Sequence, residues 1–276
     1  MTREGKIEMA TATVPAIEEN TGQSMLVNYL VSMARTVEGT INKAMEALLT
    51  RDERLASEVF MVEPRVNEME IVIDEHAVRM LRGGAARTGG PAAGLAEADI
   101  RLVVATLRIN TDLERMGDMA VNIGQRVLAL AQTKNTEPPA ELPAMCNAVR
   151  AMVAKTLGAL IFQNVTLAQE VLESDDVVDQ YRDRVFEALL AEMTGTPSRV
   201  PPNVQYVLAS RYLERIADHS TNIAEDILFW VRGLDVRHGR DRAPSGAAGQ
   251  PVPARIHEAH VTGISRRSDT AGTDPA

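Results

Sequence analysis

The chain has 276 residues, of which 45% are hydrophobic and 24% are charged, as in a globular protein of one large or two smaller domains. Only 3% are aromatic, which argues against an all-β protein because sheet cores depend on aromatic and β-branched side chains. The formal net charge of −9 has the wrong sign for a phosphate-binding surface, so no nucleic acid is expected as a partner.

Residues 1–24 carry no apolar periodicity, and the acids and the proline among them interrupt any run that could form a signal peptide. We expect this N-terminus to be flexible. No later stretch approaches the roughly 18 apolar residues of a membrane span. The single cysteine, Cys146, permits no internal disulfide, which fits a reducing compartment. The sequence therefore predicts a cytoplasmic protein without direct membrane insertion.

Helical periodicity begins near Met25 and continues to Leu48, with apolar residues three and four apart. Thr50 and Glu53 have the spacing of a capping box, which predicts that a second helix begins there. Its apolar positions continue in register past Pro64, so we predict one helix with a kink at this proline. A break at the proline is the alternative.

A glycine-rich loop over residues 82–91 precedes a third predicted helix, over 99–132. Three prolines within 133–143 predict a linker. The periodic segments that follow predict three more helices, over 144–173, 175–194 and 202–232. The rest of the chain is rich in Gly, Pro, Ser and Arg and shows no periodicity, so we predict a disordered tail over 234–276.

The two halves of the predicted helical body are similar in sequence. Residues 113–123, LERMGDMAVNI, align with 213–223, LERIADHSTNI. Upstream, LASEV at 55–59 aligns with LAQEV at 167–171, and the glycine-rich loop accounts for the different spacing. A match interrupted only at a loop indicates an internal repeat. We predict an all-α fold of two tandem homologous three-helix bundles, over residues 25–135 and 136–233.

Carboxylates recur four residues apart along the last predicted helix of each repeat, which places neighbours in each series on one helix face. The series are Glu114, Asp118 and Asn122 in the first copy and Glu214, Asp218, Asn222 and Asp226 in the second. Like charges at this spacing destabilise a helix by a few tenths of a kcal/mol, so we expect a compensating cation.

That cation is either an arginine or a metal ion. The arginines within helical reach are Arg108, Arg115, Arg211 and Arg215. Oxygen donors in a flexible array equally suit Ca²⁺, Mg²⁺, Mn²⁺ or non-haem iron.

Further acids precede each series. They are Glu63, Glu70 and Asp74, with Asn67 among them, in the first copy, and Asp175 and Asp179 in the second. Glu63 and Asp175 either join the carboxylates of the last helix or, if helices begin there, serve as N-caps or first-turn charges.

The motifs of an enzyme are missing. The predicted helices hold no Glu-x-x-His motif of the di-iron oxidases, and no Gly-x-Gly-x-x-Gly or P-loop pattern occurs. Cys146 has no obvious histidine partner, and His219 is read as a packing or surface residue. We predict a non-enzymatic binding or regulatory protein. The alternatives are a metal-dependent enzyme on an all-α carboxylate-rich scaffold and a purely structural helical scaffold.

Residues 111–123 and 211–226 resemble the paired signatures of the PhoU family, and the similarity covers roughly 25–233. The resemblance implies two three-helix bundles, a homodimer and a place in the bacterial cytoplasm. It implies a regulator of phosphate uptake that restrains the phosphate-starvation response. Such a protein would be an adaptor between the ATPase subunit of the phosphate transporter and its membrane sensor histidine kinase.

The resemblance also implies binding of cations, with Fe, Mn, Mg, Zn and Ca as candidates, at Glu/Asp-x-x-x-Asp motifs. These motifs fall on Glu114 with Asp118, on Glu214 with Asp218, and on Asp175 with Asp179. Glu63 stands at the position of Asp175 in the first copy, and Asn67 at that of Asp179. Asn122, Asn222, Asp226, Arg115 and Arg215 share the helix of these motifs and are expected on the same face.

Overall fold

A computed structural model describes residues 21–86, 96–133 and 137–236. Most of the expected flexible N-terminus, part of the glycine-rich loop and nearly all of the expected disordered tail lie outside these ranges. The described elements are all helical, which confirms the predicted class. They are α1 (Thr21–Thr50), α2 (Glu53–Phe60), α3 (Glu63–Ala86), α4 (Glu97–Ala131), α5 (Leu142–Phe162), α6 (Val165–Leu172), α7 (Asp175–Gly195), the short 3₁₀ helix η1 (Pro197–Arg199) and α8 (Val200–Arg232).

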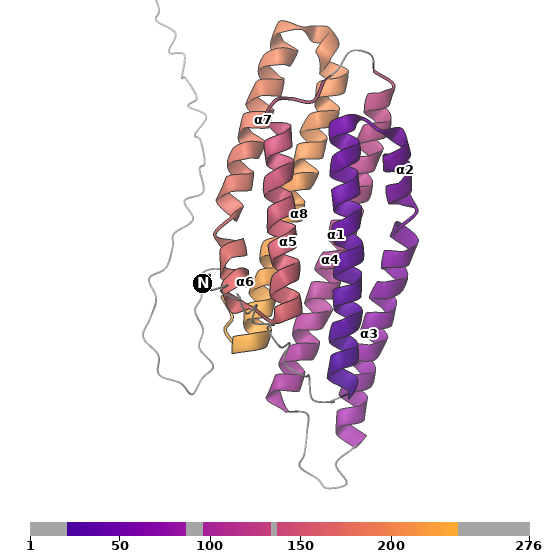
Figure 1. Cartoon of the computed structure of the whole chain (residues 1–276), viewed down its shortest axis with the longest axis vertical. Coiled ribbons are helices and arrows are strands. Elements are labelled where there is room, and N and C mark those ends of the chain that lie inside the picture. Colours follow the sequence, from indigo (N-terminus) through magenta and orange to yellow (C-terminus); the bar gives the residue numbers. More distant parts are fainter. Residues whose placement is uncertain (1–20, 87–95, 134–136, 237–276) are drawn as a thin grey trace, which may run out of the picture.

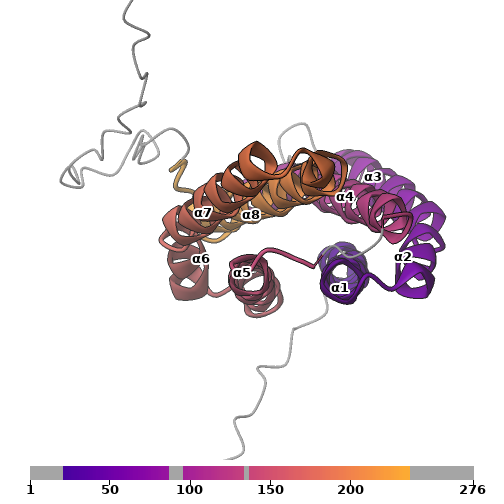
Figure 2. The ribbon, with the colours of Figure 1, turned by 90° about the horizontal axis from the view of Figure 1, so that it is seen from above.

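The long helices run along the longest axis of the molecule (Figure 1). Seen from above, α1 and α5 lie side by side below an arc that contains α7, α8, α4 and α3 (Figure 2). The contact between α4 and α8 joins the two repeats most extensively. In this contact Arg108 pairs with Asp226, and Arg126 donates to Gln205, so the two helices run antiparallel.

The internal repeat is visible in how the first helix of each copy ends. After α1, Arg51 adopts a left-handed conformation with φ 56°, and after α5, Gln163 does the same with φ 47°. The next residue caps the following helix in both copies: the side chains of Asp52 and Asn164 accept from the backbone N–H groups two and three residues further on. These side chains satisfy donors that a helix start leaves without partners.

Asp52 therefore caps α2, and the predicted capping box with Thr50 is wrong. Thr50 is the last residue of α1, and its hydroxyl donates to the Glu46 carbonyl one turn back. A short polar side chain fits either role, and the left-handed Arg51 shifts the cap to the residue after it.

The predicted continuous helix with a kink at Pro64 is also wrong, and the alternative break is correct. Helix α2 ends at Phe60 and α3 begins at Glu63, so Pro64 lies in the first turn, where a missing N–H costs nothing. The helix predicted over 144–173 is likewise divided into α5 and α6. Apolar periodicity continues across both breaks, so it could not reveal them.

A single apolar core runs through both repeats and includes residues from every α-helix. Its largest fully buried side chains include Ile41, Met116 and Tyr206. Within the described ranges, α5 is the one helix that is long and apolar enough to cross a membrane, judged by length and composition alone. The expectation that no stretch approaches a membrane span therefore does not hold for α5. Helix α5 packs against α1, α6, α7 and α8, as expected for a core helix.

Candidate functional site: two carboxylate arrays

The first array lies between α3 and α4 and consists of Glu63, Asn67, Glu70, Glu114 and Asp118. Four of them, all except Glu70, line one small pocket. Its volume of about 10 Å³ has room for a single water or ion. Glu63 is the first residue of α3, so its two predicted roles, as a first-turn charge and as a member of the array, both describe its place.

The carboxylates of the first array repel one another. Burial and then the charges of Asp118 and Glu70 raise the pKa of Glu114, while Arg115 opposes this. Burial and then the charges of Asp74 and Asp118 raise the pKa of Glu70. In the described part of the chain, no Lys or Arg forms an ion pair with Glu63, Glu70, Glu114 or Asp118. The first array, as far as the structure describes it, therefore has no counterion bonded to its carboxylates, and the nearby charge of Arg115 acts only on Glu114.

The second array lies between α7 and α8 and consists of Asp179, Arg182, Glu214 and Asp218. The guanidinium of Arg182 lies at its centre, with Nη1 at 3.1 Å from Asp179 Oδ1 and also bonded to Glu214. Asp175 is the first residue of α7, as its predicted first-turn role requires. An arginine therefore compensates the charges of Asp179 and Glu214 in this array.

Arg182 was not among the arginines predicted for this role. Of those four, Arg211 comes within 3.8 Å of Glu214, while Arg115 and Arg215 are exposed. Arg108 contacts an acid outside the array. The position of Arg182 three residues after Asp179 is the sequence signal that could have identified it.

Arg182 offsets the charge of the second array only in part. Burial raises the pKa of Asp179, and Arg182 opposes the rise. Burial and then the charges of Glu214 and Asp179 raise the pKa of Asp218, while His219 and Arg182 oppose it. The acids of the second array thus still repel one another around the guanidinium.

The predicted common face of the last helix does not extend to Asn222 and Asp226. The buried Asp226 lies 3.2 Å from Arg108, and both residues line a groove of about 430 Å³ between α4 and α8, together with Asn222 and Arg115. Each step of four residues overshoots a helical turn by about 40°, so three steps turn Asp226 about 120° away from Glu214. Asn122, two steps beyond Glu114, is half-buried on α4.

A further polar pair joins the repeats. His219 Nδ1 lies 2.8 Å from Asp112 Oδ1, and both side chains are largely buried between α8 and α4. The sequence predicts His219 as a packing or surface residue and does not predict its partner Asp112. No local pattern connects it with Asp112, because the two meet only where the repeats pack together.

The residues of the arrays do not form a metal centre as they stand. Across the described ranges, no group of three or more His, Cys, Asp or Glu side chains is placed to hold a metal ion. In the second array, the guanidinium of Arg182 already forms ion pairs with carboxylate oxygens of Asp179 and Glu214. Binding of iron, manganese, magnesium, zinc or calcium stays a prediction.

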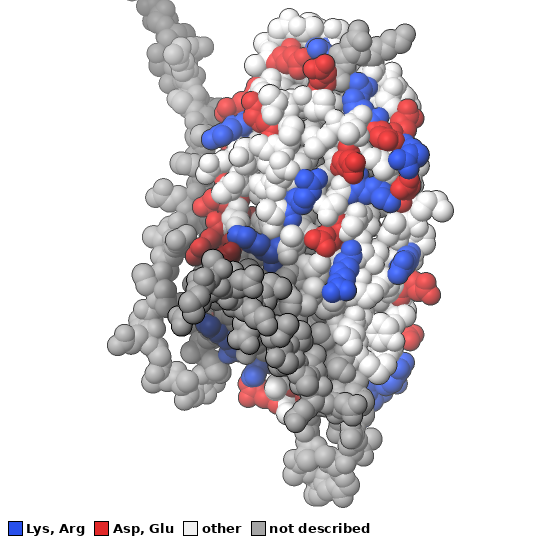
Figure 3. All heavy atoms as spheres, in the orientation of Figure 1, with Lys and Arg blue, Asp and Glu red and all other residues white. Residues whose placement is uncertain are grey.

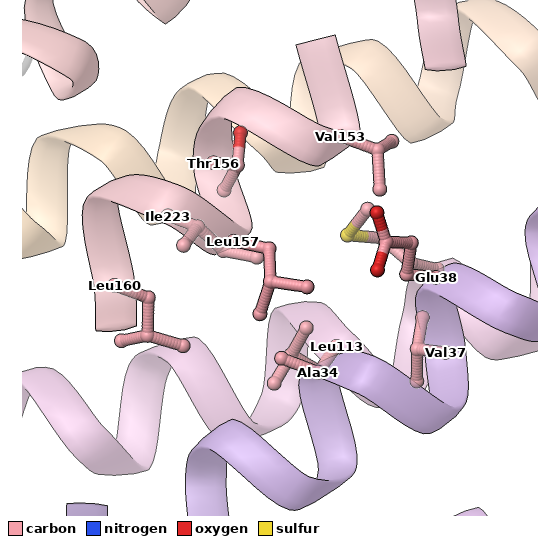
Figure 4. Close-up of a pocket in the computed structure, with 10 residues that line it drawn as sticks. Ala34, Val37, Glu38, Leu113, Val153, Thr156, Leu157, Leu160 and Ile223 are labelled. Carbon is pink, nitrogen blue, oxygen red and sulfur yellow. The ribbon is translucent and has the colours of Figure 1, made fainter. Parts of the chain in front are cut away.

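An apolar pocket lies where α1, α4, α5 and α8 meet (Figure 4). Ala34 and Val37 line it from α1, and Leu157 and Leu160 from α5, while Glu38 brings a carboxylate to its edge. The lining is almost entirely apolar, so this pocket suggests no catalytic or metal-binding role.

On the face that carries α1 and α5, acidic side chains gather along the α7 edge, and both charge signs are interspersed elsewhere (Figure 3).

Comparison with known proteins identifies related chains. A PhoU domain model matches residues 30–127 and again residues 142–227. The phosphate-specific transport system accessory protein PhoU homolog of Pseudomonas putida is 34% identical over 240 residues, covering 86% of this chain and 90% of its own length. The corresponding homolog of Clostridium acetobutylicum is 31% identical, covering 76% of this chain and 93% of its own length.

Two solved structures of PhoU proteins are similar in fold to this chain. The crystal structure of PhoU from Pseudomonas aeruginosa has a TM-score of 0.71 at 31% identity, covering 78% of this chain and 99% of that one. The phosphate transport system regulatory protein PhoU from Streptococcus pneumoniae has a TM-score of 0.68 at 24% identity, which supports the fold alone. The two tandem three-helix bundles are thus a known architecture.

Proposed function

Because the chain belongs to the PhoU family, we propose that it is an accessory regulator of the phosphate transport system. The observation that carries this proposal is the double match of the family domain, once in each bundle, in a chain that spans most of the length of its relatives. Those relatives are named as accessory proteins of phosphate-specific transport.

In finer detail, we propose a cytoplasmic homodimer that links the ATPase subunit of the phosphate transporter to its sensor histidine kinase and restrains the phosphate-starvation response. The net charge of −9 supports docking to basic surfaces, since opposite charges speed association and salt screens the effect. The helical body, with one core shared by both repeats, supports a role in holding two partners in place rather than in transforming a substrate.

A non-enzymatic role is supported by the side chains themselves. Burial raises the pKa of the Cys146 thiol to about 12, so it is a poor nucleophile at neutral pH. Two carboxylates of the second array, those of Asp179 and Glu214, are bonded to Arg182, which disfavours the alternative of a metal-dependent enzyme. Neither array, as described, pairs a nucleophile with a general base.

The regulatory role is tested by deleting the gene in its host and measuring phosphate-starvation transcripts in medium with abundant phosphate. We expect expression to rise, and to fall again when the full chain is restored. A version ending at residue 233 should also restore repression, because both domain matches lie within it. Unchanged expression after deletion would contradict the regulatory assignment.

The adaptor role needs a separate measurement. The purified full chain is titrated against the transporter ATPase subunit and, independently, against the cytoplasmic part of the kinase. We expect binding to both, with association rates that fall as salt is raised. If the chain binds the ATPase subunit but not the kinase, the accessory role stands and the adaptor role is wrong.

A further inference from the structure

The two carboxylate arrays differ at one equivalent position. Helices α3 and α7 begin at Glu63 and Asp175, after equivalent caps and equivalent short helices. Glu70 and Arg182 follow these starting residues by the same number of positions. One repeat therefore places a carboxylate where the other places a guanidinium.

Both side chains interact with the last helix of their repeat. The charge of Asp118 on α4 raises the pKa of Glu70, and the guanidinium of Arg182 bonds to Glu214 on α8. Arg182 also lies 2.8 Å from Asp183, in addition to Asp179. Its side chain is only 23% exposed, and that of Glu214 only 16%. A planar guanidinium fork can serve several carboxylates at once, which a lysine cannot do as well.

We propose that Arg182 is the resident counterion of the second array and does there what a bound divalent cation would do. Because its guanidinium already bonds to Asp179 and Glu214, a metal ion would have to displace it. The second array therefore needs no divalent cation, and any dependence on such ions originates elsewhere in the protein. This inference does not depend on the regulatory role.

The test compares Arg182→Gln with wild type by thermal unfolding of the full chain at pH 7.5 in chelator. Loss of the guanidinium leaves the surrounding acids in mutual repulsion, so we expect a melting temperature lower by about 5 °C. Millimolar Mn²⁺ or Mg²⁺ should restore part of this loss, and should stabilise the variant more than wild type. Arg182→Lys keeps the charge and should lose less than half as much.

The pH dependence separates a role in charge from a role in packing. The charged groups around Arg182 are Asp179 and Asp183 on α7 and Arg211, Glu214 and Asp218 on α8. Asp179 and Asp218 have raised pKa values, and their protonation relieves part of the repulsion, so the difference between Arg182→Gln and wild type should be smaller at pH 5 than at pH 7.5.

Glu70→Arg is the reciprocal variant, since it gives the first array the counterion of the second. We expect its melting temperature in chelator to exceed that of wild type by about 2 °C. The proposal is overturned if Arg182→Gln melts like wild type, loses as much at pH 5 as at pH 7.5, or gains nothing from either cation. It is also overturned if Asp218→Asn, but not Asp118→Asn, removes Mn²⁺ that copurifies with wild type. Should Arg182→Gln fail to fold, an unaltered melting temperature in both Arg182→Lys and Glu70→Arg would overturn it.

Discussion

Glu114 is half-buried between α3 and α4, with Asp118 one turn away and Glu70 across the helix contact. Its pKa is raised in the folded chain, by burial first. Such a carboxyl takes up its proton more readily when folded than when unfolded, so stability falls as pH rises from the ordinary pKa to the raised one. The full penalty is present at pH 7 and absent in acid.

We therefore predict that Glu114→Gln raises the free energy of unfolding at pH 7 by about 0.5 kcal/mol, in line with removal of a like-charge contact. The gain should disappear toward pH 4. Urea unfolding at both pH values measures it, with Glu68→Gln, an exposed change on the same α3, as a control expected near zero. A loss of stability of equal size at both pH values would show that Glu114 acts through packing instead.

Asp226 is a second residue with a buried charge, and it pairs with an arginine across the contact between the repeats. It is 4% exposed and lies 3.2 Å from Arg108, whose guanidinium also lies 5.4 Å from the centre of the Phe229 ring. We predict that Arg108→Ala lowers the free energy of unfolding by about 1–2 kcal/mol. This is less than the roughly 3–5 kcal/mol of a fully buried pair, because the arginine is partly solvated.

The matched control for Arg108→Ala is Arg211→Ala, since Arg211 is 59% exposed and 3.8 Å from its acid. We expect it to cost less than about 0.5 kcal/mol. Equal losses from the two variants, measured by denaturant unfolding, would contradict a special role for the contact between Arg108 and Asp226.

At the scale of elements, the helix caps provide the sharpest test of the revised helix boundaries. We predict that Asp52→Ala and Asn164→Ala each lower the free energy of unfolding by about 1 kcal/mol, because each removes the acceptor for two backbone N–H groups. Thr50→Ala should have a much smaller effect, since Thr50 ends α1. A larger loss from Thr50→Ala than from Asp52→Ala would restore the predicted capping box.

Helix content and order could be predicted because apolar spacing is a local property of the chain. The breaks before Glu63 and Val165 could not, because the apolar register passes through them. The break before Val165 depends on the left-handed Gln163 followed by the capping side chain of Asn164, whereas at the break before Glu63 the residue after α2, Met61, keeps a right-handed helical conformation. A left-handed residue followed by an Asp or Asn cap occurs in both copies, at Arg51 and Asp52 and at Gln163 and Asn164, and this correspondence is visible in the sequence only once the repeats are aligned there.

At the scale of the whole molecule, one core spans both repeats, and α4 and α8 form its largest internal contact. We predict that the described body unfolds in a single transition. Fluorescence of Trp230, the one tryptophan, reports on α8, and far-UV circular dichroism reports on all helices. The two signals should have coincident midpoints in denaturant. Separate midpoints would show that the two repeats unfold independently despite their shared core.

The sequence by itself determined the all-α class, the tandem repeat and the acids Glu114, Asp118, Glu214 and Asp218 on the last helix of each copy. Periodicity and self-similarity carry this information, and both are read along the chain without knowledge of packing. Only the tertiary structure decided which partner each acid has. Arg182 reaches Glu214 because α7 packs against α8, and Arg108 meets Asp226 because the repeats join antiparallel. The physical reason is that sequence spacing determines which face of its own helix a residue occupies. A counterion for these acids lies on a neighbouring helix, and the position of that helix depends on how the whole core packs.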